Sequence, residues 1–161
     1  MPLYEKSSRK PFQIALVEPE IPPNTGNIGR LCVATGSVLH LVGKLGFQID
    51  DKQVKRAGLD YWQHLKLQQH ADFHSLKKAN PDARTLFFSK RGKIPYTEAK
   101  YQQGDFLVFG SETTGLPQEL MDENPEATYY IPTTKLVRSL NIANACSVVL
   151  YEAIRQVGTW E

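Results

Sequence analysis

The chain has 161 residues and a formal net charge of +2, with 41% hydrophobic and 22% charged residues. This composition is typical of a globular domain and excludes a largely disordered chain. A net charge so close to zero does not by itself indicate a nucleic-acid-binding protein.

The ends of the chain and its hydropathy set the expected organisation. No stretch approaches the roughly 20 apolar residues of a membrane span. Residues 1–11 lack the apolar core of a signal peptide, so we expect a cytoplasmic protein without a membrane partner. We interpret residues 1–11 as a flexible N-terminal extension and residues 12–161 as a single domain.

The first half of the chain alternates between predicted strands and helices. Residues 12–17 form a predicted strand, and residues 18–24 form a stiff loop because proline fixes φ and disfavours helix and central strand. A helix follows over residues 26–35 and ends at Gly36, before a strand over residues 38–42. Asp50 and Asp51 begin a short helix that Gly58 ends.

The second half repeats this alternation. We expect strands over residues 65–67, 85–89, 106–109 and 127–131, and helices over residues 72–79, up to Met121, and 142–154. Short, continuous apolar strands that alternate with helices predict an α/β fold with a mostly parallel sheet and helices on both faces.

The last predicted helix is apolar on nearly every side and should therefore be buried. A narrow polar stripe runs along it: Asn141, Asn144, Ser147 and Tyr151. Ser139 can cap its N-terminus. The stripe either bonds neighbouring backbone or forms a ligand site beside the strand end at Ile131, because a helix N-terminus offers free N–H groups.

Cysteine and histidine show no pattern for a nucleophile or a metal. Cys32 and Cys146 lie inside apolar helical patterns, which favours reduced core thiols. The histidines are scattered, and His70 and His74 lack the glutamate and third ligand of a zinc motif. We interpret the histidines as part of a solvated helix edge and expect no metal.

Basic residues form three clusters that follow or flank predicted strand ends. These are Lys52-Lys55-Arg56, Lys90-Arg91-Lys93 and Lys135-Arg138. A cluster of this size is usually a solvated surface, and only convergence of the clusters in space would make a phosphate-binding track.

Three loops at predicted strand ends carry the candidate chemistry, because parallel sheets bind ligands beyond the carboxyl ends of their strands. The loop after residue 17 contains Gly26 and Gly29 but not the dinucleotide-binding pattern G-x-G-x-x-G. The loop after residue 109 places Gly110 beside Glu112, which could instead compensate a helix dipole, worth about 0.3 to 1 kcal/mol. The third loop is residues 131–144. Together they indicate a nucleotide-like ligand.

These three motifs, in this order, resemble the SPOUT superfamily of RNA methyltransferases over nearly the whole chain. Three stretches are similar, more narrowly, to its TrmL (YibK-like) branch: residues 18–27 (EPEIPPNTGN), 56–61 (RAGLDY) and 138–152, which begin RSLN. Gly29 and Ser111 depart from the pattern of that branch, in which bulkier residues or proline are common.

The resemblance implies a 2′-O-methyltransferase that uses S-adenosylmethionine and works as a homodimer with a C-terminal trefoil knot. Its substrate would be the wobble cytidine or uridine in the anticodon stem-loop of certain leucine tRNAs. The implied cofactor-binding residues are Phe88, Gly110, Ile131 and Ser139. Arg30 matches the catalytic arginine of the first motif, with Asn27 beside it, whereas Glu112 and Asn141 match the second and third motifs.

Methyl transfer to a ribose hydroxyl needs in-line placement of oxygen, methyl and sulfur, and the hydroxyl must lose a proton. The resemblance assigns this proton to Arg30 with help from an RNA phosphate. Because arginine has a pKa above 12, a role in holding that phosphate and stabilising the developing oxyanion is equally compatible with the sequence.

One other enzyme class and two alternatives within the family compete with this interpretation. A dinucleotide-dependent oxidoreductase should show G-x-G-x-x-G directly after the first strand, where a proline-rich loop stands here. The alternatives within the family are a methyltransferase for another tRNA or rRNA position and a non-catalytic RNA-binding homologue.

The last helix also predicts an assembly. It is apolar on more sides than one small core can cover, so we expect residues 142–154 and 26–35 to meet at a two-fold interface. Such an interface would bring Arg30 of one chain near the cofactor site of the other.

Overall fold

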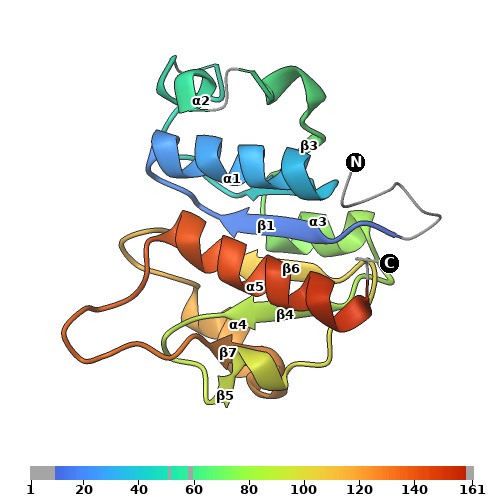
Figure 1. The fold of residues 1–161 in the computed structure, drawn as a ribbon, viewed down its shortest axis with the longest axis vertical. Coiled ribbons are helices and arrows are strands. Elements are labelled where there is room, and N and C mark those ends of the chain that lie inside the picture. The colour runs from blue at the N-terminus through green and yellow to red at the C-terminus, as the bar shows by residue number, and fades with distance from the viewer. Residues whose placement is uncertain (1–9, 51, 58–59, 159–161) are drawn as a thin grey trace.

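The computed structural model describes residues 10–50, 52–57 and 60–158 (Figure 1). One seven-stranded sheet has the order β3-β2-β1-β6-β4-β7-β5. Its strands are β1 (Gln13–Val17), β2 (Val38–Val42), β3 (Leu67–His70), β4 (Thr85–Phe88), β5 (Ile94–Pro95), β6 (Phe106–Phe109) and β7 (Thr128–Tyr130). All of these neighbours pair in parallel, which confirms the predicted sheet. The predicted N-terminal extension is residues 1–11, of which residues 1–9 lie outside the described part of the chain.

Helices cover both faces of the sheet. They are α1 (Pro22–Thr35), α2 (Lys52–Ala57), α3 (Phe73–Ala79), α4 (Gln118–Glu123) and α5 (Ile142–Val157), with short 3-10 helices η1 (Trp62–His64), η2 (Tyr96–Glu98) and η3 (Pro125–Ala127). Figure 1 shows α1 and α5 in front of the strands and α3 and α4 behind them. Within the described part of the chain, no helix is both long and apolar enough to cross a membrane.

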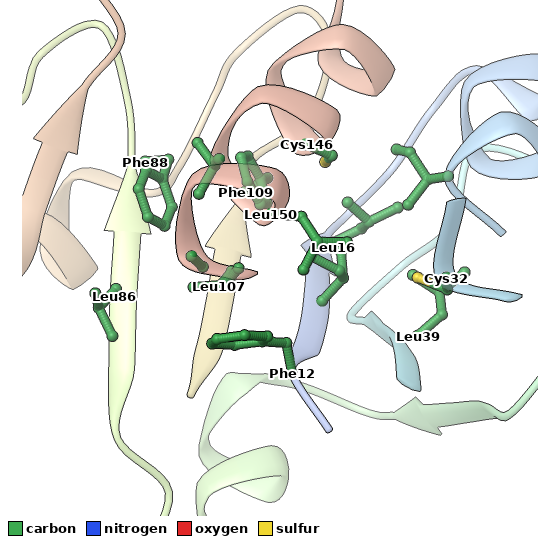
Figure 2. Packing of buried hydrophobic residues seen from close by; sticks show 14 of the residues in the cluster. Phe12, Leu16, Cys32, Leu39, Leu86, Phe88, Leu107, Phe109, Cys146 and Leu150 are labelled. Carbon is green, nitrogen blue, oxygen red and sulfur yellow. The ribbon is translucent and has the colours of Figure 1, made fainter. Parts of the chain in front are cut away.

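The alternation of side chains along β1 explains the two cores. Ile14 and Leu16 point to the face covered by α1 and α5, where Cys32 and Cys146 lie in the same buried cluster (Figure 2). Ala15 and Val17 point to the opposite face, where the buried residues include Leu76 of α3 and Met121 of α4. The prediction of helices on both faces is therefore confirmed.

The start of α1 corrects the sequence prediction. The helix begins at Pro22 rather than at Gly26, with Ile21 at the N-cap. Proline is tolerated in the first helical turn because its missing N–H would have no intrahelical partner there. Gly36 ends the helix in a left-handed conformation with φ 69°, as predicted.

Other features of the fold also differ from the predictions. The third strand lies at residues 67–70 rather than 65–67, and the two-residue strand β5 was not predicted. Ser139 does not cap α5. Asn141 is the N-cap, and its Oδ1 accepts hydrogen bonds from the backbone N–H groups of Ala143 at 2.9 Å and Asn144 at 3.3 Å.

Helix α5 is not buried on all sides of this chain. Val148 is 37% exposed and Tyr151 is 43% exposed, on the same side as the exposed Asn144. Ser147 donates its hydroxyl to the backbone oxygen of Ala143 at 2.9 Å. The polar stripe therefore lies mainly along an exposed face, and the expectation of complete burial is wrong for the single chain.

Two glycines allow loops to pack backbone against backbone near the ends of β6 and β7. A Cβ on Gly110 would lie 2.0 Å from the carbonyl carbon of Gly115 and 2.1 Å from the nitrogen of Leu116. A Cβ on Gly92 would lie 2.6 Å from the carbonyl carbon of Tyr129. The trefoil knot stays a prediction, with which this close packing is consistent.

Candidate functional site

A cavity of about 720 Å³ is lined by loops that follow three strands of the sheet. Residues 88–91 lie at the end of β4 and after it, residues 109–116 at the end of β6 and after it, and residues from Ile131 to Asn141 follow β7. Ile21 and Asn24, at the start of α1, and Ile142 and Ala145, in α5, also line it. Ligand cavities in proteins span about 300 to 1,000 Å³, so this one has the size for a nucleotide-like molecule. Of the three loops predicted to meet, those after residues 109 and 131 line the cavity, and the one after residue 17 contributes Ile21 and Asn24.

The four residues predicted to bind a cofactor all line this cavity. They are Phe88, Gly110, Ile131 and Ser139. Phe88 is buried and stacks on Phe109, with ring centroids 5.1 Å apart. Ser139 is exposed in the segment that connects β7 to α5. The wall thus offers an aromatic surface and a hydroxyl to the same space.

Glu112 also lines the cavity, and its carboxylate binds the beginning of α1. Oε2 accepts a hydrogen bond from the backbone N–H of Glu20 at 2.8 Å, and Oε1 accepts one from that of Ile21 at 3.1 Å. These N–H groups lie before the first turn, and Ile21 offers no side-chain cap. Any dipole compensation by Glu112 therefore concerns α1, not the helix that follows it in sequence.

Asn24 connects Glu112 to Asn141. Its Nδ2 donates to Glu112 Oε1 at 3.4 Å, and its Oδ1 accepts from Asn141 Nδ2 at 3.0 Å. A continuous chain of hydrogen bonds thus joins the loops after β1, β6 and β7. Asn24 was not among the predicted site residues; it lies in the first turn of α1, which the sequence prediction assigned to a loop.

Arg30 and Asn27 lie outside the cavity. Both are exposed on α1, and the Arg30 guanidinium carbon lies 4.7 Å from the centroid of the Tyr61 ring. The structure therefore brings two of the four predicted catalytic residues, Glu112 and Asn141, to the cavity. It places the other two on a separate surface of the same chain.

Two of the three basic clusters reach the cavity. Lys90, Arg91 and Arg138 line it. Arg91 donates to the Oε1 atom of Gln118 and to the backbone oxygen of Leu116, both at 2.6 Å, and so braces the loop after β6. The cluster that begins at Lys52 lies on α2 and does not line the cavity.

The cysteines are free core thiols, as predicted. Cys32 and Cys146 are buried, and burial raises the pKa of both thiols well above the usual range. A raised pKa suppresses the nucleophilic thiolate, so neither residue is suited to covalent catalysis.

The histidine interpretation is wrong for His40. This residue is buried in β2, with Nε2 2.7 Å from Gln13 Oε1 and Nδ1 2.9 Å from His70 Nε2. Burial, followed by the charge of His70, lowers the pKa of His40 to about 4. Among the described residues, no group of three or more histidine, cysteine or acidic side chains could hold a metal ion.

Comparison with known proteins gives the family. The model of the SpoU rRNA Methylase family matches residues 11–151. A relative from Escherichia coli (strain K12), named tRNA (cytidine(34)-2′-O)-methyltransferase, is 46% identical over 148 residues, which are 91% of this chain and 94% of the relative.

Solved structures agree with this match. One described as "Structural insights into the 2-OH methylation of C/U34 on tRNA" has a TM-score of 0.87 and 44% identity, and the match covers 92% of this chain and 97% of that chain. An AdoMet-bound rRNA methyltransferase from Sinorhizobium meliloti has a TM-score of 0.83 and 25% identity, covering 92% of this chain and 57% of that one. This chain therefore belongs to the SpoU rRNA methylase family.

Proposed function

We propose that this protein is a tRNA 2′-O-methyltransferase. It transfers a methyl group from S-adenosylmethionine to the ribose 2′-OH of the wobble nucleotide, position 34, in the anticodon stem-loop of leucine tRNAs. The observation that carries the proposal is the cavity at which the loops after β4, β6 and β7 meet. The names of the relatives support position 34, with cytidine or uridine as the nucleotide. We place the enzyme in the cytoplasm, with its substrate.

The residues at the cavity fit S-adenosylmethionine. The ligand combines a flat base, a ribose and a charged amino-acid end, and the wall combines aromatic, aliphatic and hydroxyl groups with backbone. We propose that Phe88, Gly110, Ile131 and Ser139 hold it. When bound, its sulfonium makes the methyl group electrophilic.

Glu112 and Asn141 are proposed to act by positioning. The Glu112 carboxylate already accepts hydrogen bonds from two backbone N–H groups and from Asn24. Asn141 uses its oxygen to cap α5 and its nitrogen to bind Asn24. These contacts hold three loops in register, and exact placement of reacting atoms supplies much of the rate in an in-line transfer.

Arg30 and Asn27 are proposed to bind the RNA. A guanidinium presents a planar fork of N–H donors that matches a phosphate, and it keeps its proton in water. Arg30 would therefore hold a phosphate and stabilise the developing oxyanion at the ribose. Lys90 and Arg138, at the cavity wall, would contact further phosphates. Removal of the hydroxyl proton by Arg30 is the competing mechanism.

A homodimer completes this site in our proposal. Leu136, in the loop after β7, is 93% exposed, and α5 exposes Val148 and Tyr151. A second copy packed on α1 and α5 would cover this apolar surface, and a two-fold axis would use the same patch on both chains. Because Arg30 lies outside the cavity of its own chain, this axis would place it at the cavity of the partner.

The proposal is tested by methyl transfer from radiolabelled S-adenosylmethionine to unmodified leucine tRNA transcripts. We expect one methyl group per tRNA. The matched control is the same tRNA with a 2′-deoxy nucleotide at position 34, which should accept none. Equal incorporation into both would support another position, and no incorporation together with tRNA binding would support a non-catalytic RNA-binding protein.

A further inference from the structure

The Arg30 side chain is exposed, yet its guanidinium contacts an aromatic ring. Its guanidinium carbon lies 4.7 Å from the centroid of the Tyr61 ring, within the range of a cation–π contact. An exposed arginine otherwise samples many rotamers, which would scatter its N–H donors over a large volume. The ring of Tyr61 therefore limits where these donors can be.

Unlike an ion pair, the contact with Tyr61 leaves the N–H donors of the Arg30 guanidinium free. The ion pairs formed by arginines within the described residues join Arg84 to Asp105 and Arg155 to Glu152, so none there neutralises Arg30. A carboxylate would occupy the N–H fork of a guanidinium, whereas an aromatic face binds the cation through its flat side. Tyr61 thus orients Arg30 and leaves its donors open to a phosphate or ribose.

The turn that carries Tyr61 packs against α1. Tyr61 is the N-cap of η1, and its backbone oxygen accepts a hydrogen bond from His64 N–H at 2.9 Å. This turn packs on α1 at the residue directly before Arg30: a Cβ on Gly29 would lie 3.2 Å from Leu65 Cδ2 and 3.8 Å from Trp62 Cζ3. The small residue at position 29 lets the turn approach closely, so ring and guanidinium are carried by two elements in contact.

We infer that Tyr61 is a positioning residue for Arg30, which it orients for contact with the RNA through the face of its ring. This inference rests on the proposed function of Arg30. A cation–π contact at an exposed site stabilises the bound rotamer enough to change its population about two- to fivefold. Loss of the ring should lower the rate of methyl transfer by a similar factor, without changing the affinity for S-adenosylmethionine.

The test compares Tyr61→Leu with Tyr61→Phe, and His64→Leu on the same turn is the control. Single-turnover methylation of leucine tRNA should fall about two- to fivefold in Tyr61→Leu and stay near wild type in Tyr61→Phe and His64→Leu. An unchanged rate in Tyr61→Leu, or an equal loss of rate in Tyr61→Phe, would overturn the inference.

A second measurement separates this inference from the proposed function. The NMR signal of the Arg30 Nε–H group should carry a ring-current shift in the wild type and in Tyr61→Phe, and this shift should disappear in Tyr61→Leu. If the wild-type protein transfers no methyl group, the proposed function fails, and the ring-current shift still decides whether Tyr61 holds Arg30. Absence of the shift in the wild type would refute the contact.

Discussion

The side-chain nitrogen of Asn141 donates a hydrogen bond to Oδ1 of Asn24 at 3.0 Å, although 117 residues separate the two in sequence. Asn24 in turn donates to Glu112, which holds the backbone before α1. The segments after β1, β6 and β7 are therefore coupled through side chains at the cavity. A substitution in one of these segments should therefore change the affinity of the whole cavity for the cofactor.

Asn24→Ala tests this coupling. The substitution removes the bridge between Glu112 and Asn141, and lost hydrogen bonds of this kind cost about 1 to 2 kcal/mol, so the Kd for S-adenosylmethionine should rise roughly 5- to 30-fold. Isothermal titration calorimetry measures this directly. Asn27→Ala is the matched control, because Asn27 is exposed outside the cavity and its loss should leave cofactor affinity unchanged. Equal affinities in both variants would contradict the coupling.

Glu112→Gln should lower the free energy of unfolding. The carboxylate accepts bonds from Glu20 N–H and Ile21 N–H, and a charged acceptor contributes roughly 1.5 to 3 kcal/mol in such a place. The amide keeps one acceptor oxygen and turns an N–H₂ group toward the other donor, so we expect a loss of about 1 to 3 kcal/mol in urea denaturation. Glu123→Gln, exposed at the end of α4, should change stability by less than about 0.5 kcal/mol. If Glu112→Gln and Glu123→Gln changed the free energy of unfolding by similarly small amounts, the hydrogen bonds of the Glu112 carboxylate would not stabilise the fold.

The buried His40, which contacts the half-buried His70, predicts a dependence of stability on pH. Burial lowers the pKa of His40 from 6.5 to about 4, so the unfolded chain takes up the proton more readily between these values. Stability is then complete above about pH 6.5 and falls as the pH drops toward 4, by roughly 2 to 3 kcal/mol for this group.

His40→Gln tests this dependence, because glutamine can bond to Gln13 but does not titrate. Urea denaturation between pH 7.5 and 4.5 should show a shallower loss of stability in this variant than in wild type. His74→Gln, on α3, should follow the wild-type curve. The same slope in all three proteins would rule out His40 as the cause.

The secondary structure was predictable wherever one local rule decided it. The strands Val38–Val42 and Phe106–Phe109 were predicted with their observed bounds, because continuous apolar runs of this length fit buried parallel strands. The start of α1 was missed because Pro22 has two meanings, a helix breaker in an interior and a favoured residue in a first turn. Which of these two roles Pro22 takes depends on the backbone conformation of the residues before it.

The site was predictable in its location but not in its contacts. Ser139 and Asn141 both stand where an N-cap of the last helix could lie. In the structure Asn141 is the N-cap, and it also bonds to Asn24, which belongs to a distant segment of the chain. His40 was misplaced because its partner His70 is 30 residues away and depends on how β3 pairs with β2. Such contacts follow from the register of the sheet, which short sequence patterns do not specify.

Mixed dimers test whether the site is shared between subunits. Arg30→Ala removes the proposed RNA contact, and Ser139→Trp fills the cavity of its own chain with a bulky side chain. If Arg30 serves the cavity of the partner, a mixed dimer keeps one working site, so random mixing of two inactive variants should restore about a quarter of wild-type activity. If Arg30 serves its own chain, the mixture should stay inactive, which would contradict the shared site.

Mass-spectrometric mapping of 2′-O-methylation in tRNA from cells with and without this protein tests whether it methylates position 34. We predict that leucine tRNAs carry a 2′-O-methylated nucleotide at position 34, that this modification is absent when the protein is removed, and that it returns with the wild-type protein but not with Arg30→Ala. Unchanged methylation at position 34 in cells without the protein, or loss of methylation only at another position, would contradict it.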